Sequence, residues 1–313
     1  MADLISYVIR KILLAIPVII LATLIVFLML YLTPGDPILA IISPHTTPEE
    51  VEQLRDKYGL DEPPYVQYGS FLWRLAHGDL GKSVGADSLN LQVSDLIVQK
   101  LPRTLELMAI GLTISYSLGI PLGIYSALRQ NSWGDRGVMV FTLVAYAMPA
   151  FWLGILFMLL FAVRYHILPV EGTVGGFSSI ILPAMTLGIG NAALTTRMMR
   201  SSMLEVKRQD YITQLRSRGL PEREVIYKHA LKNAILPVIT VIGLDIGWFV
   251  GGAVIVETVF AWPGLGMLMT KAILNHNFPV VQGCVLVLAV FVIMGNLLAD
   301  ILYAYVDPRV RLG

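Results

Sequence analysis

The sequence predicts an all-α integral membrane protein with six transmembrane helices. Of its 313 residues, 56% are hydrophobic and 14% are charged, and the mean hydropathy is +0.69. Soluble domains are usually about 45–50% apolar and about 25% charged. The apolar residues also gather in six segments, each long enough to cross roughly 30 Å of hydrocarbon as a helix. These segments are Ile12–Leu32, Thr104–Leu128, Val138–Val163, Ile180–Thr196, Ile235–Val256 and Gly283–Tyr305.

The positive charges in the short connections predict how these spans are oriented. If the spans alternate in direction, the cations near both termini, between the second and third spans and in residues 197–237 all fall on one side. The short loops on the other side carry only Arg164 and Lys271. Because an excess of Lys and Arg marks the cytoplasmic side, we expect both termini and residues 197–237 to be cytoplasmic.

The first span is expected to stay in the protein. Arg10 and Lys11 precede an apolar run longer than the roughly 7–15 residues of a cleavable signal peptide, and no small-x-small cleavage pattern follows it. We therefore divide the chain into the N-terminus with the first span (1–32), an extracytoplasmic segment (33–102) and a core domain with five spans (103–313).

The extracytoplasmic segment is too polar to span a membrane but carries two helix signals. Residues 47–50 form a capping box with proline at the first helical position. A second helix is expected over Tyr65–His77, stopped by Gly78. The segment is either a small external cap on the bundle or a vestibule for an arriving donor protein, and the two are compatible.

Residues 197–237 are a charged interruption between two apolar spans. They contain nine of the 23 Lys and Arg residues. The pattern predicts two amphipathic helices. The first runs over Met203–Arg218 and ends at Gly219, and the second runs over Pro221–Asn233 with acidic residues in its first turn.

Two such helices need a partner for their apolar stripes. An anionic lipid surface would attract each cation by on the order of 1 kcal/mol. However, Glu205, Asp210, Glu222 and Glu224 are interleaved with the bases, which weakens that attraction. The charge pattern therefore slightly favours a protein surface of mixed charge.

Asp245 is a carboxylate inside the fifth span. An ionised carboxylate at this depth costs on the order of 2.5–3.5 kcal/mol on insertion scales, so it should face the bundle interior or water. Asp245 either lies on or near a translocation path, where it could attract a cationic group, or forms a structural hydrogen bond with a neighbouring span.

Small residues in the spans predict close helix packing. Gly243, Gly247 and Gly251 repeat every four residues, a spacing that lets another helix approach. That helix belongs either to this chain or to a second subunit at a seam that moves during gating. Gly119 and Gly123, with Pro121 between them, could break the second span in a similar way.

Large side chains in two spans are further candidates for a path through the membrane. Met148, Phe151 and Trp152 surround a kink expected at Pro149, and they either line a path or fill the bundle. The candidate path residues are Asp245, Trp248, Met148, Phe151 and Trp152.

No motif indicates an enzyme, and we expect no catalytic, cofactor or metal site in this chain. Gly-x-Ser-x-Gly, His-Glu-x-x-His and Cys-x-x-Cys do not occur. Gly81-Lys82-Ser83 lacks the first glycine of a phosphate-binding loop. Cys284 is the only cysteine and lies in an apolar span, so a packed structural thiol is expected. A net charge of +1 gives no reason to expect nucleic acid.

Several stretches resemble the permeases of ABC importers, specifically the peptide/nickel branch. His229-Ala230-Leu231-Lys232-Asn233-Ala234, between Gly219 and Pro237, is similar to the cytoplasmic coupling loop of that family. One departure is Thr213-Gln214-Leu215, where the family carries Glu-Ala-Ala. Other stretches that match in order are Tyr58-Gly59-Leu60-Asp61, Leu101-Pro102-Arg103-Thr104, Glu257-Thr258-Val259-Phe260 and Asp307-Pro308-Arg309.

The resemblance implies a type I importer permease fold and a role for the loop in coupling. A second homologous permease subunit, cytoplasmic ATPase subunits that bind ATP and Mg, and an extracytoplasmic solute-binding protein would be the partners, in a prokaryotic inner membrane. The residues expected to contact the ATPase are Asp210, Tyr211, Leu215, Gly219, Leu220, Glu222, His229, Ala230, Lys232, Asn233 and Pro237. In the loop before the last span, relatives often carry an Arg-Asp pair where this chain has His276-Asn277.

The resemblance also implies alternating-access import of di- or oligopeptides. Nickel chelates, glutathione and oligosaccharides are alternative solutes for chains with this pattern. An ATP-independent secondary carrier is the alternative from another class. Such a carrier would show paired ionisable groups or matching polar breaks in its two halves, and the solitary Asp245 argues against it. A purely structural scaffold would not need that acid.

Overall fold

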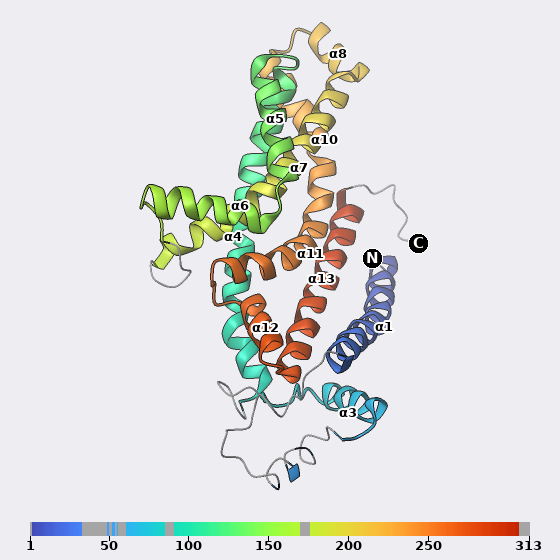
Figure 1. Cartoon of the computed structure of the whole chain (residues 1–313). Coiled ribbons are helices and arrows are strands. Elements are labelled where there is room, and N and C mark those ends of the chain that lie inside the picture. Colours follow the sequence, from blue (N-terminus) through green and yellow to red (C-terminus); the bar gives the residue numbers. More distant parts are fainter. Residues whose placement is uncertain are drawn as a thin grey trace. The chain divides into compact units, whose positions relative to one another are not determined.

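The computed structural model describes residues 2–32, 61–84, 91–169 and 176–306, and four isolated positions between 49 and 55. All elements named in these ranges are helices (Figure 1), and the β contact found there is a single bridge between Lys82 and Gln92. The capping box at residues 47–50 lies almost entirely outside the described residues.

The helices follow the order expected of a multi-span bundle. Five described helices are long and apolar enough to cross a membrane, and the α5–α6 pair makes a sixth crossing if its two parts count as one span. The elements are α1 (Ala2–Leu32), α3 (Pro64–Ala76), α4 (Val93–Leu128), α5 (Trp133–Ala147), α6 (Ala150–Phe157), η3 (Met158–Arg164), η4 (Gly176–Ile180), α7 (Ile181–Lys207), α8 (Asp210–Ser217), α9 (Glu222–Glu224), η5 (Val225–Ala230), α10 (Leu231–Ala234), α11 (Leu236–Val259), α12 (Leu265–Leu274) and α13 (Phe278–Val306).

The third span is broken rather than gently kinked. Met148 is extended, with φ −79° and ψ 128°, as expected for a residue before proline, and a new helix begins at Ala150. The two parts are bent by 109°. The expected kink at Pro149 is therefore present, but it is large enough to make two separate helices.

The second span is continuous, and the expected break at its glycines is wrong. α4 runs unbroken past Gly119 and Gly123. A Cβ added at Gly119 would lie 2.7 Å from the Cβ of Thr195, and one at Gly123 would lie 2.6 Å from the Cβ of Met199. These glycines therefore allow α7 to pack closely on α4 and do not interrupt the helix.

The chain divides into two compact units, which we describe separately. The first contains residues 1–7, 105–262 and 292–313. Its central element is α7, which packs against α5, α6, α10 and α11. Fourteen of the 27 residues of α7 are buried, which explains why a helix with several polar residues can lie inside a membrane bundle.

The second unit contains residues 8–104 and 263–291. Its core includes Cys284, which is fully buried as expected for a structural thiol. Asn277 is also buried: its Oδ1 accepts a 3.2 Å hydrogen bond from the backbone N–H of Val84, and its Nδ2 donates to Ser83 Oγ at 2.7 Å. The departure at His276-Asn277 therefore places a structural amide in this loop.

Candidate functional site

The charged segment forms a compact loop on the end of α7. We call residues 208–235, between α7 and α11, the coupling loop. The predicted first helix over Met203–Arg218 is wrong in its start, because Met203 to Lys207 belong to α7 and a separate helix, α8, begins at Asp210. The predicted second helix is confirmed as the helical stretch α9–η5–α10, which contains a π-helical turn over Val225–Ala230.

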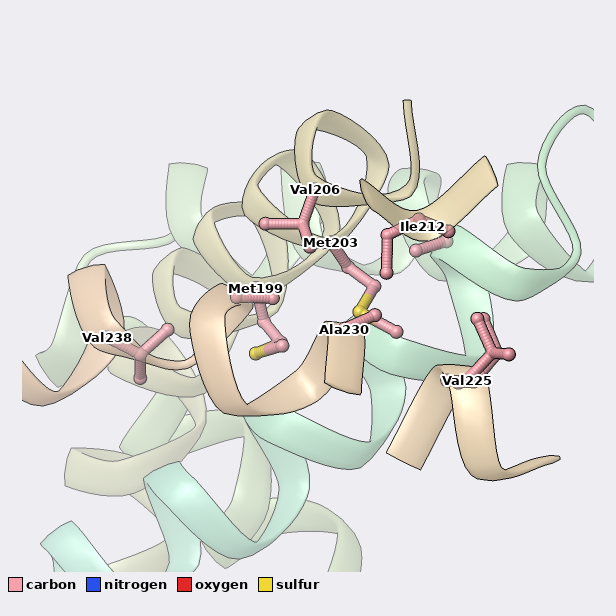
Figure 2. Close-up of a cluster of buried hydrophobic side chains, with 10 residues drawn as sticks. Met199, Met203, Val206, Ile212, Val225, Ala230 and Val238 are labelled. Carbon is pink, nitrogen blue, oxygen red and sulfur yellow. The ribbon is translucent and has the colours of Figure 1, made fainter. Parts of the chain in front are cut away.

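The apolar side chains of the coupling loop pack on this chain itself. A buried cluster joins α7, α8, η5, α10 and the first turn of α11, with Ala127 from the end of α4 (Figure 2). This chain itself therefore covers part of each stripe, and Leu204, Tyr211 and Leu215 stay partly exposed to the lipid or protein partner that was expected. The buried members are Ala127, Met199, Met203, Val206, Ile212, Val225, Ile226, Ala230, Ala234 and Val238.

Burial separates the predicted coupling residues into two groups. Ala230 is fully buried, and Tyr211, Leu215, Leu220 and His229 are half-buried, so these five shape the loop. The other predicted residues are exposed and could contact a partner: Asp210, Gly219, Glu222, Lys232, Asn233 and Pro237.

Gly219 ends α8 in a Schellman motif. Its backbone is left-handed, with φ +79°. The N–H of Gly219 donates to the carbonyl of Arg216 at 2.9 Å, and the N–H of Leu220 donates to the carbonyl of Leu215 at 3.4 Å. A Cβ at Gly219 would meet nothing within 4 Å, so the backbone conformation, and not space, requires glycine here.

Polar contacts hold the two halves of the coupling loop together. Arg216 Nη2 and Nε donate to the two carboxylate oxygens of Glu222 at 2.8 and 3.0 Å. The hydrogen bond from this guanidinium lowers the pKa of Glu222. Asn233 Nδ2 donates to the hydroxyl of Tyr211 at 2.7 Å, which joins α10 to α8. The loop therefore has the contacts of a single folded body.

A buried ion pair fixes α7 to α4 and α5 close to the coupling loop. Arg200 Nε and Nη2 each donate to Asp135 at 2.8 Å, and Ser126 also donates to Asp135. The Asp135 side chain is 4% exposed. Asp135 further accepts from the backbone N–H of Asn131 at 2.9 Å, and Ser132 caps α5. Sequence reasoning missed this pair, although an acid three residues after a capping serine was a visible signal.

Asp245 lies where three helices of the first unit meet. It is 6% exposed. The Tyr116 hydroxyl from α4 donates to its carboxylate, and Asn191 Nδ2 from α7 donates to it at 2.7 Å and to Ser115 Oγ at 3.1 Å. The prediction that this acid faces the bundle interior is confirmed. A hollow beside it, lined mainly by apolar side chains of α7 and α11, is too narrow for a water molecule. These contacts match the structural alternative, and a role in translocation stays a prediction.

None of the other path candidates lines the hollow beside Asp245, and none is among the hydrogen-bond partners of Asp245 described above. Trp248, Phe151 and Trp152 are exposed on the described part of the chain. Met148 is half-buried at the break between α5 and α6. The two tryptophans and Phe151 therefore lie on the surface of the first unit, and the predicted role of all four side chains in translocation is untested.

The glycine repeat of α11 faces more than one environment. A Cβ at Gly243 would collide with the backbone and side chain of Ala299 in α13, so Gly243 serves packing within this chain. A Cβ at Gly247 would be 3.4 Å from Val292, an ordinary contact, and one at Gly251 would meet nothing within 4 Å. Of the three, therefore, only Gly243 needs to be glycine for packing within the described residues.

Comparison with known proteins identifies the family of this chain. Residues 119–312 match the family described as "Binding-protein-dependent transport system inner membrane component", and residues 4–108 match the family of its N-terminal part. The chain is 38% identical over 315 residues to the oligopeptide transport system permease protein AppB of Bacillus subtilis, covering 98% of this chain and 99% of the relative. It is also 38% identical over 333 residues to the dipeptide transport system permease protein DppB of Alkalihalophilus pseudofirmus, with the same coverage.

A solved structure shares the fold. A chain of the MetNI methionine ABC transporter in an inward-facing conformation aligns with a TM-score of 0.59 at 18% identity, covering 68% of this chain and 96% of that chain. Together, the five or six candidate spans and the charged loop packed on a central helix define a membrane-embedded transport subunit of the ABC permease fold. The chain belongs to the family of binding-protein-dependent transport system inner membrane components. It is a transport component and not an enzyme, and its family implies ATPase and solute-binding partners.

Proposed function

We propose that this chain is one of two homologous permease subunits of an ATP-driven importer of di- or oligopeptides or peptide-like solutes. The relatives named above carry oligopeptide and dipeptide transport in their names and match over nearly the whole chain. The observation that carries the proposal is the coupling loop, whose apolar side is built into the cluster on α7 and whose polar side is left exposed.

The exposed polar side of the coupling loop suits an ATPase. Asp210, Glu222 and Lys232 present charges of both signs on one loop, which favours a protein surface over anionic lipid. The cation distribution supports a cytoplasmic position for this loop and for both termini. ATP and Mg would be bound by the ATPase subunits, and a solute-binding protein would act on the opposite face.

Movement would pass from the coupling loop into the spans through contacts already described. Closure of the ATPases would displace α8–α10, and the shared cluster would carry that displacement to α7. The Arg200–Asp135 pair would move α5 with α7, and the Asp245 cluster would move α11 and α4 with it. The spans would thereby alternate between inward-open and outward-open states.

The test uses the assembled transporter in lipid with its binding protein. Lys232→Glu reverses one exposed charge of the loop and leaves the hydrogen bond between Asn233 and Tyr211 in place. We expect it to reduce solute-stimulated ATP hydrolysis sharply while membrane insertion is unchanged. Arg136→Glu, an exposed cation outside the loop on the same predicted side of the membrane, is the matched control and should leave stimulation intact. Normal stimulation in the loop variant would refute the coupling role.

Two further measurements separate the alternatives. Co-purification distinguishes an ABC permease, which brings ATPase subunits with it, from a secondary carrier, which purifies alone. The solute held by the binding protein from the native host distinguishes peptides from nickel chelates, glutathione and oligosaccharides.

A further inference from the structure

The short helix α3 (Pro64–Ala76) carries two separate apolar faces. One face packs on α1 within the second unit. Phe71 is 4% exposed, and the Tyr68 hydroxyl donates a 2.7 Å hydrogen bond to the carbonyl of Ile20 and lies 3.0 Å from Thr23 Oγ1. The ring centroid of Tyr68 is 5.4 Å from that of Phe27. Tyr68 therefore anchors this face of α3 on α1, and Phe71 is buried next to Tyr68.

The other face of α3 is aromatic and uncovered. Tyr65 is 77% exposed and Trp73 is 70% exposed. Gly69 lies between them at i+4, so the three residues form one stripe along the helix. Ser70 and Arg74, each one residue further on, lie about 100° around the helix from this stripe and form a polar edge, which is also exposed.

The position of α3 along α1 indicates how deep α3 lies in the membrane. The candidate membrane span in α1 runs over Ile9–Met29. At about 1.5 Å per residue, Ile20 lies about 14 Å, Thr23 about 9 Å and Phe27 about 3 Å inside the Met29 end. The contacts of Tyr68 therefore place the buried face of α3 beside the outer half of that span. This range is centred on the depth of about 5–10 Å at which amphipathic helices lie in a membrane surface.

We propose that α3 is an interfacial helix, with the stripe of Tyr65, Gly69 and Trp73 immersed at the headgroup–acyl boundary of the leaflet at the C-terminal end of α1. Trp and Tyr are the residues that are enriched at the membrane–water interface. Two apolar side chains of α1 at this depth, Leu28 and Met29, are exposed as well, so lipid against α1 would extend onto α3. A water-soluble binding protein could not reach this depth, which is why lipid is the occupant proposed.

Cys284 makes a direct test possible, because it is the only cysteine. On a Cys284→Ala background, a nitroxide label is attached at Gly69→Cys or Ser70→Cys in the full transporter in lipid nanodiscs. A Cβ at Gly69 meets nothing within 4 Å, so the aromatic residues stay intact. We expect a severalfold higher ratio of oxygen to nickel-chelate collisions at position 69 than at 70, because oxygen concentrates in hydrocarbon and the chelate stays in water.

A second pair of labels, at Trp73→Cys and Arg74→Cys, should repeat the contrast if either first variant fails to assemble. Equal nickel-chelate collision rates within both pairs would overturn the proposal. So would a label at position 69 or 73 that is open to the chelate and becomes protected only when the binding protein is added, since the face would then be a protein-docking surface. Neither outcome bears on the coupling loop, so this proposal and the transport function can fail separately.

Discussion

Asn233 donates a 2.7 Å hydrogen bond to the hydroxyl of Tyr211, and this contact joins the last helix of the coupling loop to its first. The two residues are 22 positions apart and both belong to a loop whose apolar side rests on α7. A force applied to either end would therefore reach the other through the loop's own structure.

The first prediction concerns this contact. Tyr211→Phe keeps the ring and removes the hydroxyl, and a typical hydrogen bond contributes about 0.5–1.5 kcal/mol. We expect reduced solute-stimulated ATPase activity in the assembled transporter, with little change in overall thermal stability. Tyr227→Phe, at an exposed tyrosine of the same loop, is the control. Equal losses in both variants would show that the Tyr211–Asn233 contact has no special role.

The second prediction concerns the buried ion pair. Arg200→Met would leave Asp135 buried without its bidentate partner, which typically costs about 3–5 kcal/mol. We expect a large fall in the unfolding temperature of the purified subunit in detergent. Asp135→Leu combined with Arg200→Met removes both charges and should recover part of the loss. A double variant less stable than the single variant would contradict this account.

The third prediction compares two glycines of the same helix. Gly243→Ala would place a Cβ against the backbone of Ala299, and overpacking of this kind typically costs about 1–3 kcal/mol. Gly251→Ala places the same atom in open space and should not destabilise the isolated subunit. Thermal unfolding of both variants tests this. A loss of transport in Gly251→Ala with normal subunit stability would instead indicate a contact with another subunit.

The fourth prediction separates the two alternatives for Asp245. Tyr116→Phe removes one hydrogen bond to the carboxylate but keeps its charge. If the cluster is structural, both Tyr116→Phe and Asp245→Asn should lower stability by similar amounts and leave the apparent KM for solute unchanged. A rise in KM confined to Asp245→Asn, at unchanged stability, would place the charge on the translocation path.

Local patterns account for much of what could be predicted. The cost of burying a charge predicted that Asp245 faces inward, and Gly219 was expected at a helix end because few other residues adopt its backbone. The partners of Asp245 could not be predicted, since Tyr116 is 129 positions away and Asn191 is 54 positions away. Periodicity shows that a face is apolar, but it does not show which helix covers that face.

Because local patterns do not show which helix covers a face, the predictions for the coupling loop and for the second span were incomplete or wrong. The apolar stripes near Tyr211 and Leu215 predicted an external partner, but α7 extends to Lys207 and already covers part of them. Gly119 and Gly123 suggested a broken helix, because glycine weakens helices in isolation. In the folded chain they admit Thr195 and Met199, and tertiary packing outweighs the local preference.

The length of α7 has a mechanical consequence. At about 1.5 Å per residue, its 27 residues extend for about 40 Å, some 10 Å more than the hydrocarbon thickness of a bilayer. One uninterrupted helix of this length would reach from one leaflet into the water beyond the other, with the Arg200–Asp135 pair towards its C-terminal end and the contact with Asp245 near its middle. A helix of this kind would tilt as one rigid unit. A small displacement of its C-terminal end would therefore shift its packing contacts at every depth of the bundle.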